Sequence, residues 1–181
     1  MEIQKIPDQL QVFKYPSNHL KLVARDYDFV EDAKKEDTLI LCHRLIGAMI
    51  KYDGLSIAAT QCGLDYRIFV VNPDYLHAYD GGDKRPNIYI NPIITYKSEE
   101  TVRFKEGCLS YPKCTAWVKR HKSIVVSYKD ENGVEQTQSG DGLFAIMAQH
   151  EIDHLDGKSL IDVVDPIERE KLYKQLNKSR K

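Results

Sequence analysis

The segment Gln149-His150-Glu151-Ile152-Asp153-His154 constrains the fold more than any other part of the chain. Its two histidines are four residues apart, so on a helix both imidazole rings lie on one face. That face is otherwise apolar, because the residues seven, four and three positions before His150 are Leu143, Ile146 and Met147. A buried imidazole needs a polar partner. The sequence therefore predicts a central helix whose histidines meet a ligand or a charged group inside the molecule.

Two histidines at this spacing can bind one divalent metal ion, and Glu151 beside the first of them can exchange a proton with water at that ion. The alternative is a pair of partly buried helix histidines, with Glu151 and Asp153 as solvated charges. Catalytic sites of this type use three protein ligands and keep a fourth position for water, so another residue must supply the third ligand. The candidates are Cys42, Cys62, Cys108, Cys114, His19, His43, His77 and His121.

Cys108 is the strongest candidate for the third ligand, because it lies in the segment Glu106-Gly107-Cys108-Leu109-Ser110. The glycine before it permits a close approach of the backbone to whatever the thiolate contacts. Cys42, Cys62 and Cys114 are better explained as small buried apolar residues. For Cys42 this is supported by apolar neighbours at helical spacing on both sides.

Three segments together resemble the motifs of the peptide deformylase family, and they occur in the family's order. The family's third motif is a helix segment that begins with His-Glu and ends in His-Leu-x-Gly, and residues 150–157 match it. The second motif, Glu-Gly-Cys-Leu-Ser, is matched without change by residues 106–110. The first, Gly-x-Gly-Leu-Ala-Ala-x-Gln, is matched in altered form by residues 54–61. Three motifs in the right order are far more specific than any one alone.

The departures from the family pattern lie mainly in the first motif. Ser56 stands in place of the second glycine, near which the family's backbone approaches the bound peptide, so its side chain would narrow the cleft or change the substrate preference. Thr60 stands where proline is frequent. Further similarity runs from the Tyr15-Pro16 segment to about Ile161 and includes an Asn91-Pro92 turn, so the resemblance covers most of the chain.

The resemblance implies three groups of site residues. The metal ligands are Cys108, His150 and His154. The catalytic residues are Glu151 as general base and then acid, with Gln61 and Leu109 as donors of a side-chain amide and a backbone N–H to the charged formyl oxygen. The substrate-binding residues are Gly54, Ser56, Ile57, Glu106, Gly107, Ile146 and Met147, the last two in an apolar pocket for the methionine side chain.

The implied activity is removal of the N-formyl group from the initiator methionine of newly synthesised polypeptides, by attack of metal-bound water on the formyl carbon. In the family the ion is usually Fe2+, and Zn2+, Ni2+ or Co2+ would substitute for it. Two alternatives stay open. One is a small metallopeptidase with a different third ligand, which would have no need of Cys108. The other is an inactive relative that binds formylated peptides, an alternative that Ser56 keeps open.

Glu106 and Arg120 are expected to support the ligands. A carboxylate beside the cysteine strand would orient a metal ligand or contact the incoming peptide. Arg120 has two interpretations of equal weight. It would either join Glu106 in this role or be a solvated charge in the basic run Lys119-Arg120-His121-Lys122.

Composition limits the partners and the compartment. Lysine and arginine total 26 against 27 acidic residues, so no overall field attracts DNA or an anionic membrane. The chain has no apolar run long enough to span a bilayer, no signal-peptide core and no CxxC pair, which predicts a cytoplasmic protein. The basic run Lys178-Ser179-Arg180-Lys181 would contact the ribosome near its exit tunnel if it acts as in the family, although a solvated terminus is the simpler interpretation.

The hydrophobic pattern predicts one α+β domain over residues 1–181, with antiparallel strands wrapped around a central metal-binding helix and a C-terminal helix. Helices are expected at about 28–52, 142–155 and 166–177, the last with an apolar side of Ile167, Leu172 and Leu176. Strands are expected at 68–71, 88–90, 101–104, 116–118, 123–128 and 134–138, with a hairpin at Asn132-Gly133. Residues 54–61 and 72–87 are expected to be loops.

Overall fold

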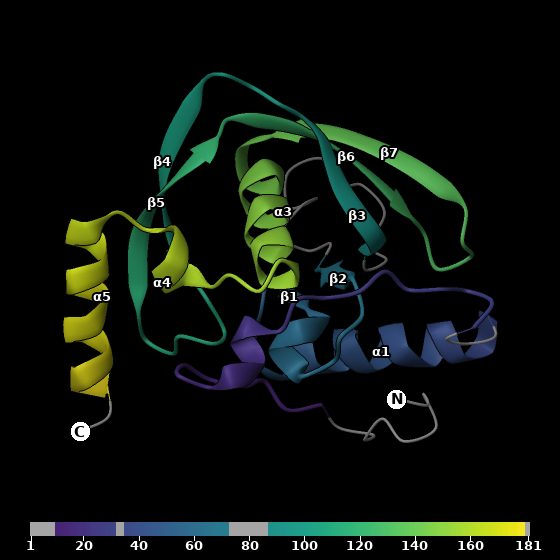
Figure 1. Ribbon diagram of the computed structural model, residues 1–181, viewed down its shortest axis with the longest axis horizontal. Coiled ribbons are helices and arrows are strands. Elements are labelled where there is room, and N and C mark those ends of the chain that lie inside the picture. The colour runs from purple at the N-terminus through teal and green to yellow at the C-terminus, as the bar shows by residue number, and fades with distance from the viewer. Residues whose placement is uncertain (1–9, 32–34, 73–86, 180–181) are drawn as a thin grey trace.

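A central helix, α3 (Gly142–Leu155), organises the computed structural model, which describes residues 10–31, 35–72 and 87–179. Strands and helices lie around it on several sides (Figure 1). Residues 144–149 are all buried, and six consecutive buried residues mean that the helix is enclosed around its whole circumference. The predicted central helix is confirmed with the same bounds.

The strands form two antiparallel sheets. The larger sheet has the order β1-β2-β3-β6-β7, with β1 (Ser56–Ala58), β2 (Ile68–Val71), β3 (Asn87–Lys97), β6 (Ser123–Lys129) and β7 (Glu135–Asp141). The smaller sheet pairs β4 (Thr101–Gly107) with β5 (Thr115–His121). β3, β6 and β7 arch over α3 on one side, and β4 and β5 lie on another (Figure 1). This arrangement confirms the predicted α+β fold with strands wrapped around a helix.

The first long helix, α1 (Lys35–Lys51), starts later than predicted. Residues 29–31 form a turn, in which Asp28 Oδ1 accepts hydrogen bonds from the N–H groups of Val30 (2.8 Å) and Glu31 (3.2 Å). An aspartate side chain that binds nearby backbone N–H groups competes with helix formation. The prediction of a helix from residue 28 was therefore wrong, and residues 32–34 lie outside the described residues.

The C-terminal end of α1 is closed by Asp53, which has a left-handed φ of 52°. The Asp53 N–H donates to the Ile50 carbonyl (3.0 Å) and the Gly54 N–H to the Met49 carbonyl (2.9 Å), the pattern of a Schellman cap.

The absence of a side chain at Gly54 is required by packing and not by the cap. A Cβ at this position would lie 2.8 Å from Leu109 Cδ1, so the glycine lets two segments distant in sequence pack closely.

Two segments predicted to be irregular belong to strands. Within residues 54–61, residues 56–58 form β1, which pairs with β2 through Ile57 and Val70, and a 3-10 helix η3 (Ala59–Cys62) follows. Asn91 and Pro92, predicted to form a turn, lie inside β3 at a register shift, where Asn91 has a φ of 52°. Both strands are stabilised by pairing with distant segments, which local turn residues do not reveal. The predicted loop at residues 72–87 lies, from 73 to 86, outside the described residues.

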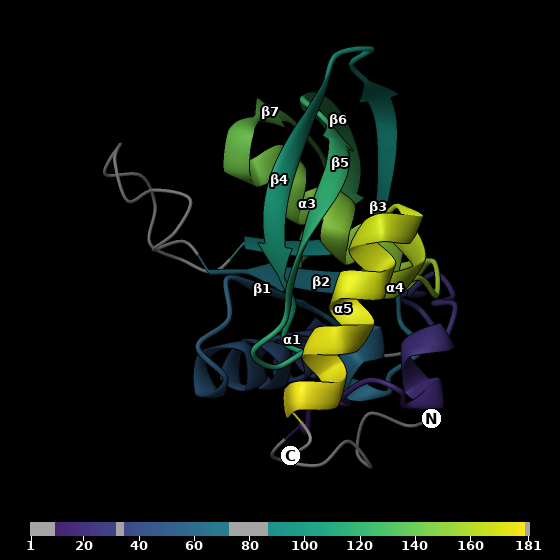
Figure 2. The same ribbon diagram turned by 90° about the vertical axis from the view of Figure 1, so that its left-hand side faces the viewer.

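The C-terminal helix α5 (Pro166–Ser179) follows a short helix α4 (Leu160–Val163) and packs against β5 (Figure 2). Leu172 and Leu176 are buried as predicted, but Ile167 is 69% exposed. The face that meets β5 instead begins at Glu168, whose Oε2 accepts a hydrogen bond from the Trp117 N–H (3.1 Å). Residues 168, 172, 175 and 176 share this face at helical spacing, and residue 167 does not.

Three clusters of buried apolar residues form the core. One lies between α1 and the β1–β2 edge, one between α3 and the larger sheet, and one between β5, α4 and α5. Cys42, Cys62 and Cys114 are buried in the first and third clusters, as predicted. Burial raises the pKa of Cys42 and of Cys62 to about 12, so both thiols stay protonated at neutral pH. No helix in the described ranges is long and apolar enough to cross a membrane.

Candidate metal centre and active site

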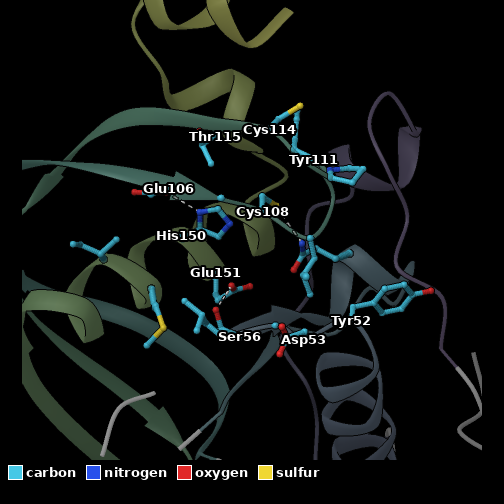
Figure 3. Close-up of a pocket in the computed structure, with 18 of the residues that line it drawn as sticks. Tyr52, Asp53, Ser56, Glu106, Cys108, Tyr111, Cys114, Thr115, His150 and Glu151 are labelled. Atoms are coloured by element: carbon cyan, nitrogen blue, oxygen red, sulfur yellow. Dashed lines mark hydrogen bonds and ion pairs between the residues drawn. The ribbon is translucent and has the colours of Figure 1, made fainter. Parts of the chain in front are cut away.

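The loop that follows β4 brings Cys108 to His150 of α3 (Figure 3) and to His154 on the same helix. The ligand atoms of Cys108, His150 and His154 all lie within 4.8 Å of one another. Cys108 Sγ is 3.3 Å from His154 Nε2, and the two imidazole centroids are 5.0 Å apart. Tetrahedral metal sites with bonds of about 2.3 Å to sulfur and about 2.0 Å to nitrogen hold their ligand atoms at comparable distances. The three side chains therefore fit one divalent ion.

Glu106 orients the first histidine of this group. Its Oε2 lies 2.8 Å from His150 Nδ1. A carboxylate only accepts hydrogen bonds, so Nδ1 carries a proton and Nε2 is the atom left for a metal ion. Burial opposes a charge on His150, but hydrogen bonds with Cys108 and Glu106 outweigh burial and raise its pKa well above the ordinary value. Binding of a metal ion at Nε2 would therefore release a proton.

The pKa of His154 is shifted in the opposite direction to that of His150. Burial, followed by the charges of His150 and Arg120, lowers the pKa of His154 well below the ordinary value. Its ring is therefore neutral at physiological pH and keeps a lone pair for a metal ion. The Thr60 hydroxyl donates to the His154 carbonyl (3.0 Å), so the threonine that stands where proline is frequent in the family connects η3 to the end of α3.

Arg120 is a buried partner of Glu106, and the interpretation as a solvated charge is wrong. Arg120 and Glu106 are 6% and 4% exposed, and the guanidinium donates two hydrogen bonds to the carboxylate, at 2.7 and 2.9 Å. It also donates to Asp153 on α3. Burial would raise the pKa of Glu106, but Arg120 and His150 outweigh burial and lower it to about 2. Both oxygens of the Glu106 carboxylate thus accept hydrogen bonds from Arg120 or His150, which orients His150.

This network makes a prediction about stability. Glu106→Gln is expected to lower the free energy of unfolding of the metal-free protein at pH 7 by about 3 kcal/mol, because Arg120 stays buried with Asp153 as its remaining charged partner. The folded-state pKa of Glu106 lies below its ordinary value of 4.5. Its contribution is therefore present above about pH 4.5 and is lost as the pH falls toward 2. Urea unfolding measured from pH 7 to pH 2 tests both statements.

The matched control for this prediction is Glu100→Gln. Glu100 is 66% exposed and pairs with Lys122 at the surface, where an ion pair contributes little to stability. We expect the free energy of unfolding of this variant to equal that of the parent at every pH from 7 to 2. Equal unfolding free energies for Glu106→Gln and the parent across the same range would contradict the proposed network.

Glu151 is buried beside the ligands with one oxygen unpaired. It is 2% exposed, and its Oε1 accepts a hydrogen bond from the Ser56 hydroxyl at 2.6 Å (Figure 3). Its Oε2 is buried without a hydrogen-bond partner among the described residues. Burial has the largest effect on the carboxyl and raises its pKa. A carboxylate with a raised pKa accepts a proton more readily at neutral pH.

Gln61 is held by both ends of its amide. Its Oε1 accepts a hydrogen bond from the Ala58 N–H (3.0 Å), and its Nε2 donates to Ser110 Oγ (3.1 Å) and lies 3.5 Å from Cys108 Sγ. Because a backbone N–H can only donate, the atom that faces Ala58 must be the amide oxygen, and the NH2 group therefore faces Cys108. Sequence reasoning quoted Ser110 within a motif but assigned it no role. The hydrogen bond from Gln61 supplies one.

Lys14 is a site residue that sequence reasoning missed altogether. Its Nζ donates to the Leu109 carbonyl at 2.6 Å, across 95 positions of sequence, and lies 4.6 Å from the centre of the Tyr52 ring. Burial lowers its pKa. A single lysine in an N-terminal segment carries no local signal of such a contact, so only the fold reveals it.

A cavity of about 640 Å3 opens beside the ligands, a volume within the range of ligand-binding pockets. Most of the predicted substrate-binding residues border it, namely Gly54, Ser56, Glu106, Gly107, Ile146 and Met147. Ile57 does not. Its side chain is fully buried in the core cluster between α1 and the β1–β2 edge. Successive residues of β1 point to opposite sides, so Ile57 faces away from the cavity that Ser56 borders. Leu109, Gln61, His150 and Glu151 also border the cavity.

Comparison with known proteins identifies the family. The model of the family described as polypeptide deformylase matches residues 9–170. The chain belongs to this family. It is 34% identical over 174 residues to a peptide deformylase from Pseudoalteromonas translucida, with 95% of this chain and 96% of the relative covered. It is 36% identical over 172 residues to peptide deformylase 2 from Xanthomonas campestris pv. campestris, with 95% and 96% covered.

A solved structure gives the same result for the fold. The crystal structure of a peptide deformylase from Legionella pneumophila matches with a TM-score of 0.81 at 27% identity, and the match covers 95% of each chain. The resemblance inferred from three sequence motifs is therefore confirmed. As a member of the polypeptide deformylase family, the chain is a hydrolase that acts on N-formylated polypeptides.

Proposed function

We propose that this chain removes the formyl group from N-formylmethionyl peptides, with Cys108, His150 and His154 holding one divalent metal ion. The observation that carries the proposal is that three ligand atoms lie within 4.8 Å of one another beside a buried carboxylate, one oxygen of which has no hydrogen-bond partner in the ranges that the structure describes. A thiolate with two imidazoles is a donor set suited to iron or zinc. A bound ion would lower the pKa of a water molecule and polarise the formyl oxygen.

Glu151 is the proton-transfer group in this proposal. Its Oε2 is buried and has no hydrogen-bond partner in the described part of the chain, so it is available to take a proton from the attacking water. The raised pKa of the carboxyl lets Oε2 hold that proton and then donate it to the amine nitrogen as the carbon–nitrogen bond breaks. The products are formate and a peptide with a free methionine amine.

Two donors would stabilise the negative charge that develops on the formyl oxygen. Donors that are already in place cost no reorganisation during the reaction. Gln61 Nε2 is one of them, since the Ala58 N–H and Ser110 Oγ hold its amide in one orientation. We propose the Leu109 backbone N–H as the second. The hydrogen bond from Lys14 Nζ to the Leu109 carbonyl restrains the residue that carries it.

The cavity suits a methionine side chain followed by an extended peptide. Ile146 and Met147 are each 5% exposed and border the cavity, so they are proposed to contact the methionine side chain. Gly54 and Gly107 both border the cavity, and the backbone is exposed at Gly107. Among the described residues, a Cβ at Gly107 would meet Thr115 Cγ2 alone, at 4.0 Å, so there is room for substrate beside it.

The finer points of the proposal rest on the family resemblance. Fe2+ is proposed as the ion in the cell, with Zn2+, Ni2+ or Co2+ as substitutes. Residues 1–181 are proposed to form one catalytic domain that works in the cytoplasm on nascent peptides at the ribosome. The basic C-terminal run proposed to contact the ribosome begins at Lys178 in α5, and its last two residues lie outside the described ranges.

The test is release of formate from a short N-formyl-methionyl peptide by protein loaded anaerobically with Fe2+. Turnover is expected with Fe2+, lower turnover with Zn2+, and none with the metal-free protein. The control is the N-acetyl-methionyl peptide, which we expect to be a much poorer substrate because its methyl group must fit where the formyl group places only a hydrogen atom. Cleavage after methionine without release of formate would favour a metallopeptidase, and peptide binding without turnover would favour an inactive relative.

A further inference from the structure

The contact between Ser56 and Glu151 joins two segments 95 positions apart, and the catalytic proposal above does not require it. Ser56 Oγ donates to Glu151 Oε1 at 2.6 Å, within the range of about 2.5 to 2.7 Å that is typical of a hydroxyl bonded to a carboxylate. The family motif that residues 54–61 resemble has glycine at this position, which offers no hydroxyl. Both side chains border the cavity.

The fold aims the Ser56 side chain at α3. Ser56 is the first residue of β1, and its neighbour Ile57 points into the core cluster between α1 and the β1–β2 edge. Because side chains alternate along a strand, Ser56 points the other way, toward the helix that carries Glu151. The pairing of Ser56 with Val71 on β2 holds this register.

The hydroxyl distinguishes the two oxygens of the Glu151 carboxylate. Oε1 is occupied by Ser56, whereas Oε2 is buried with no partner among the described residues. The last torsion of a glutamate side chain is soft and roughly two-fold, so a carboxylate without this contact could exchange its oxygens or turn away from the reacting atoms. With the contact, one oxygen is anchored and the other stays free.

We propose that Ser56 is a positioning residue, whose hydroxyl anchors Oε1 of Glu151 so that Oε2 is the oxygen that exchanges the proton. The inference rests on the proposed function, because it assigns a role to Ser56 in the same proton transfer. It differs from a steric role, in which the serine side chain only narrows the cavity and changes substrate affinity.

Three substitutions separate the two roles. Ser56→Ala keeps the Cβ and removes the hydroxyl, Ser56→Gly removes both, and Ser56→Thr keeps the hydroxyl. For a positioning residue, kcat for formate release falls about 10-fold in both Ser56→Ala and Ser56→Gly, as expected for loss of a hydrogen bond to a charged group. KM is expected to stay within about 2-fold of the parent in Ser56→Ala, and Ser56→Thr is expected to recover most of kcat.

A second measurement does not depend on turnover. The affinity of the metal-loaded protein for the deformylated product peptide, measured by calorimetry, is expected to stay within about 2-fold of the parent in Ser56→Ala, since this substitution keeps the Cβ that borders the cavity. Thr95→Ala is the matched control. It removes an exposed hydroxyl from β3 that donates to the Val125 carbonyl (3.3 Å), and kcat is expected to be unchanged.

The outcomes distinguish this inference from the proposed function. An active parent whose kcat is matched by Ser56→Ala would overturn the positioning role and leave the deformylase activity intact. A change in KM or in product affinity with an unchanged kcat would overturn it in favour of the steric role. A metal-loaded parent that releases no formate would overturn the proposed function and this inference with it.

Discussion

Glu151→Gln is expected to lower kcat for formate release about 10³-fold, the middle of the range for loss of a general base or acid. Glutamine has nearly the same shape, and its amide oxygen can still accept the hydrogen bond from Ser56 that Glu151 Oε1 accepts. Its amide nitrogen at the position of Oε2 cannot accept a proton from water. The measurement is the initial rate of formate release at saturating N-formyl-methionyl peptide.

The metal content of each preparation is measured alongside the rate, because the Glu151→Gln protein must retain its ion for the comparison to be valid. Glu135→Gln is the control for a glutamate elsewhere in the protein. Glu135 is 77% exposed and lies 4.0 Å from Lys129 at the surface, so its substitution is expected to leave kcat unchanged. A metal-loaded Glu151→Gln protein with a rate within 10-fold of the parent would rule out Glu151 as the proton-transfer group.

Cys108→Ser is expected to reduce the affinity for the divalent ion about 100-fold or more, since even the loss of a group that only supports a ligand costs about 10-fold to 100-fold. A thiolate is replaced by a hydroxyl that stays protonated at neutral pH and binds iron or zinc weakly. The ion bound per chain after dialysis against a weak chelator measures the effect, and formate release is expected to fall with it.

Cys114→Ser provides the matched control for the cysteine. Cys114 is 3% exposed and borders the same cavity, but it is not one of the three clustered ligands. We expect this variant to bind the ion as the parent does. Full retention of metal and activity by Cys108→Ser would remove Cys108 from the ligand set and would favour a metallopeptidase with another third ligand.

Parts of the fold that depend on short-range patterns were predictable. The bounds of α3 are those expected from apolar residues at helical spacing, and β6 and β7 flank the predicted Asn132-Gly133 turn. Elements that depend on distant partners were not. β1 has three residues and exists because it pairs with β2, and Ile167 is exposed because the position of β5 selects another face of α5.

The residues of the candidate site also fall into those that local sequence patterns predict and those that depend on distant partners. The proposed ligands Cys108, His150 and His154 and the proposed base Glu151 lie in two short segments, whose residue types and spacing indicate this chemistry without a structure. The burial of Arg120 is different. Within a basic run it has the local appearance of a solvated charge, and its pairing with Glu106 arises from the register of β4 and β5 against α3.

The sequence by itself determined the family, the fold class and the residue types of the candidate metal centre, because motif spacing and apolar periodicity are properties of neighbouring residues. Only the tertiary structure decided which atoms of those residues are free to react. Ser56 occupies one oxygen of Glu151, Glu106 occupies Nδ1 of His150, and Lys14 holds the carbonyl of Leu109. Each of these contacts joins segments at least 44 positions apart, and such contacts depend on how the sheets pack around α3, which no local pattern encodes.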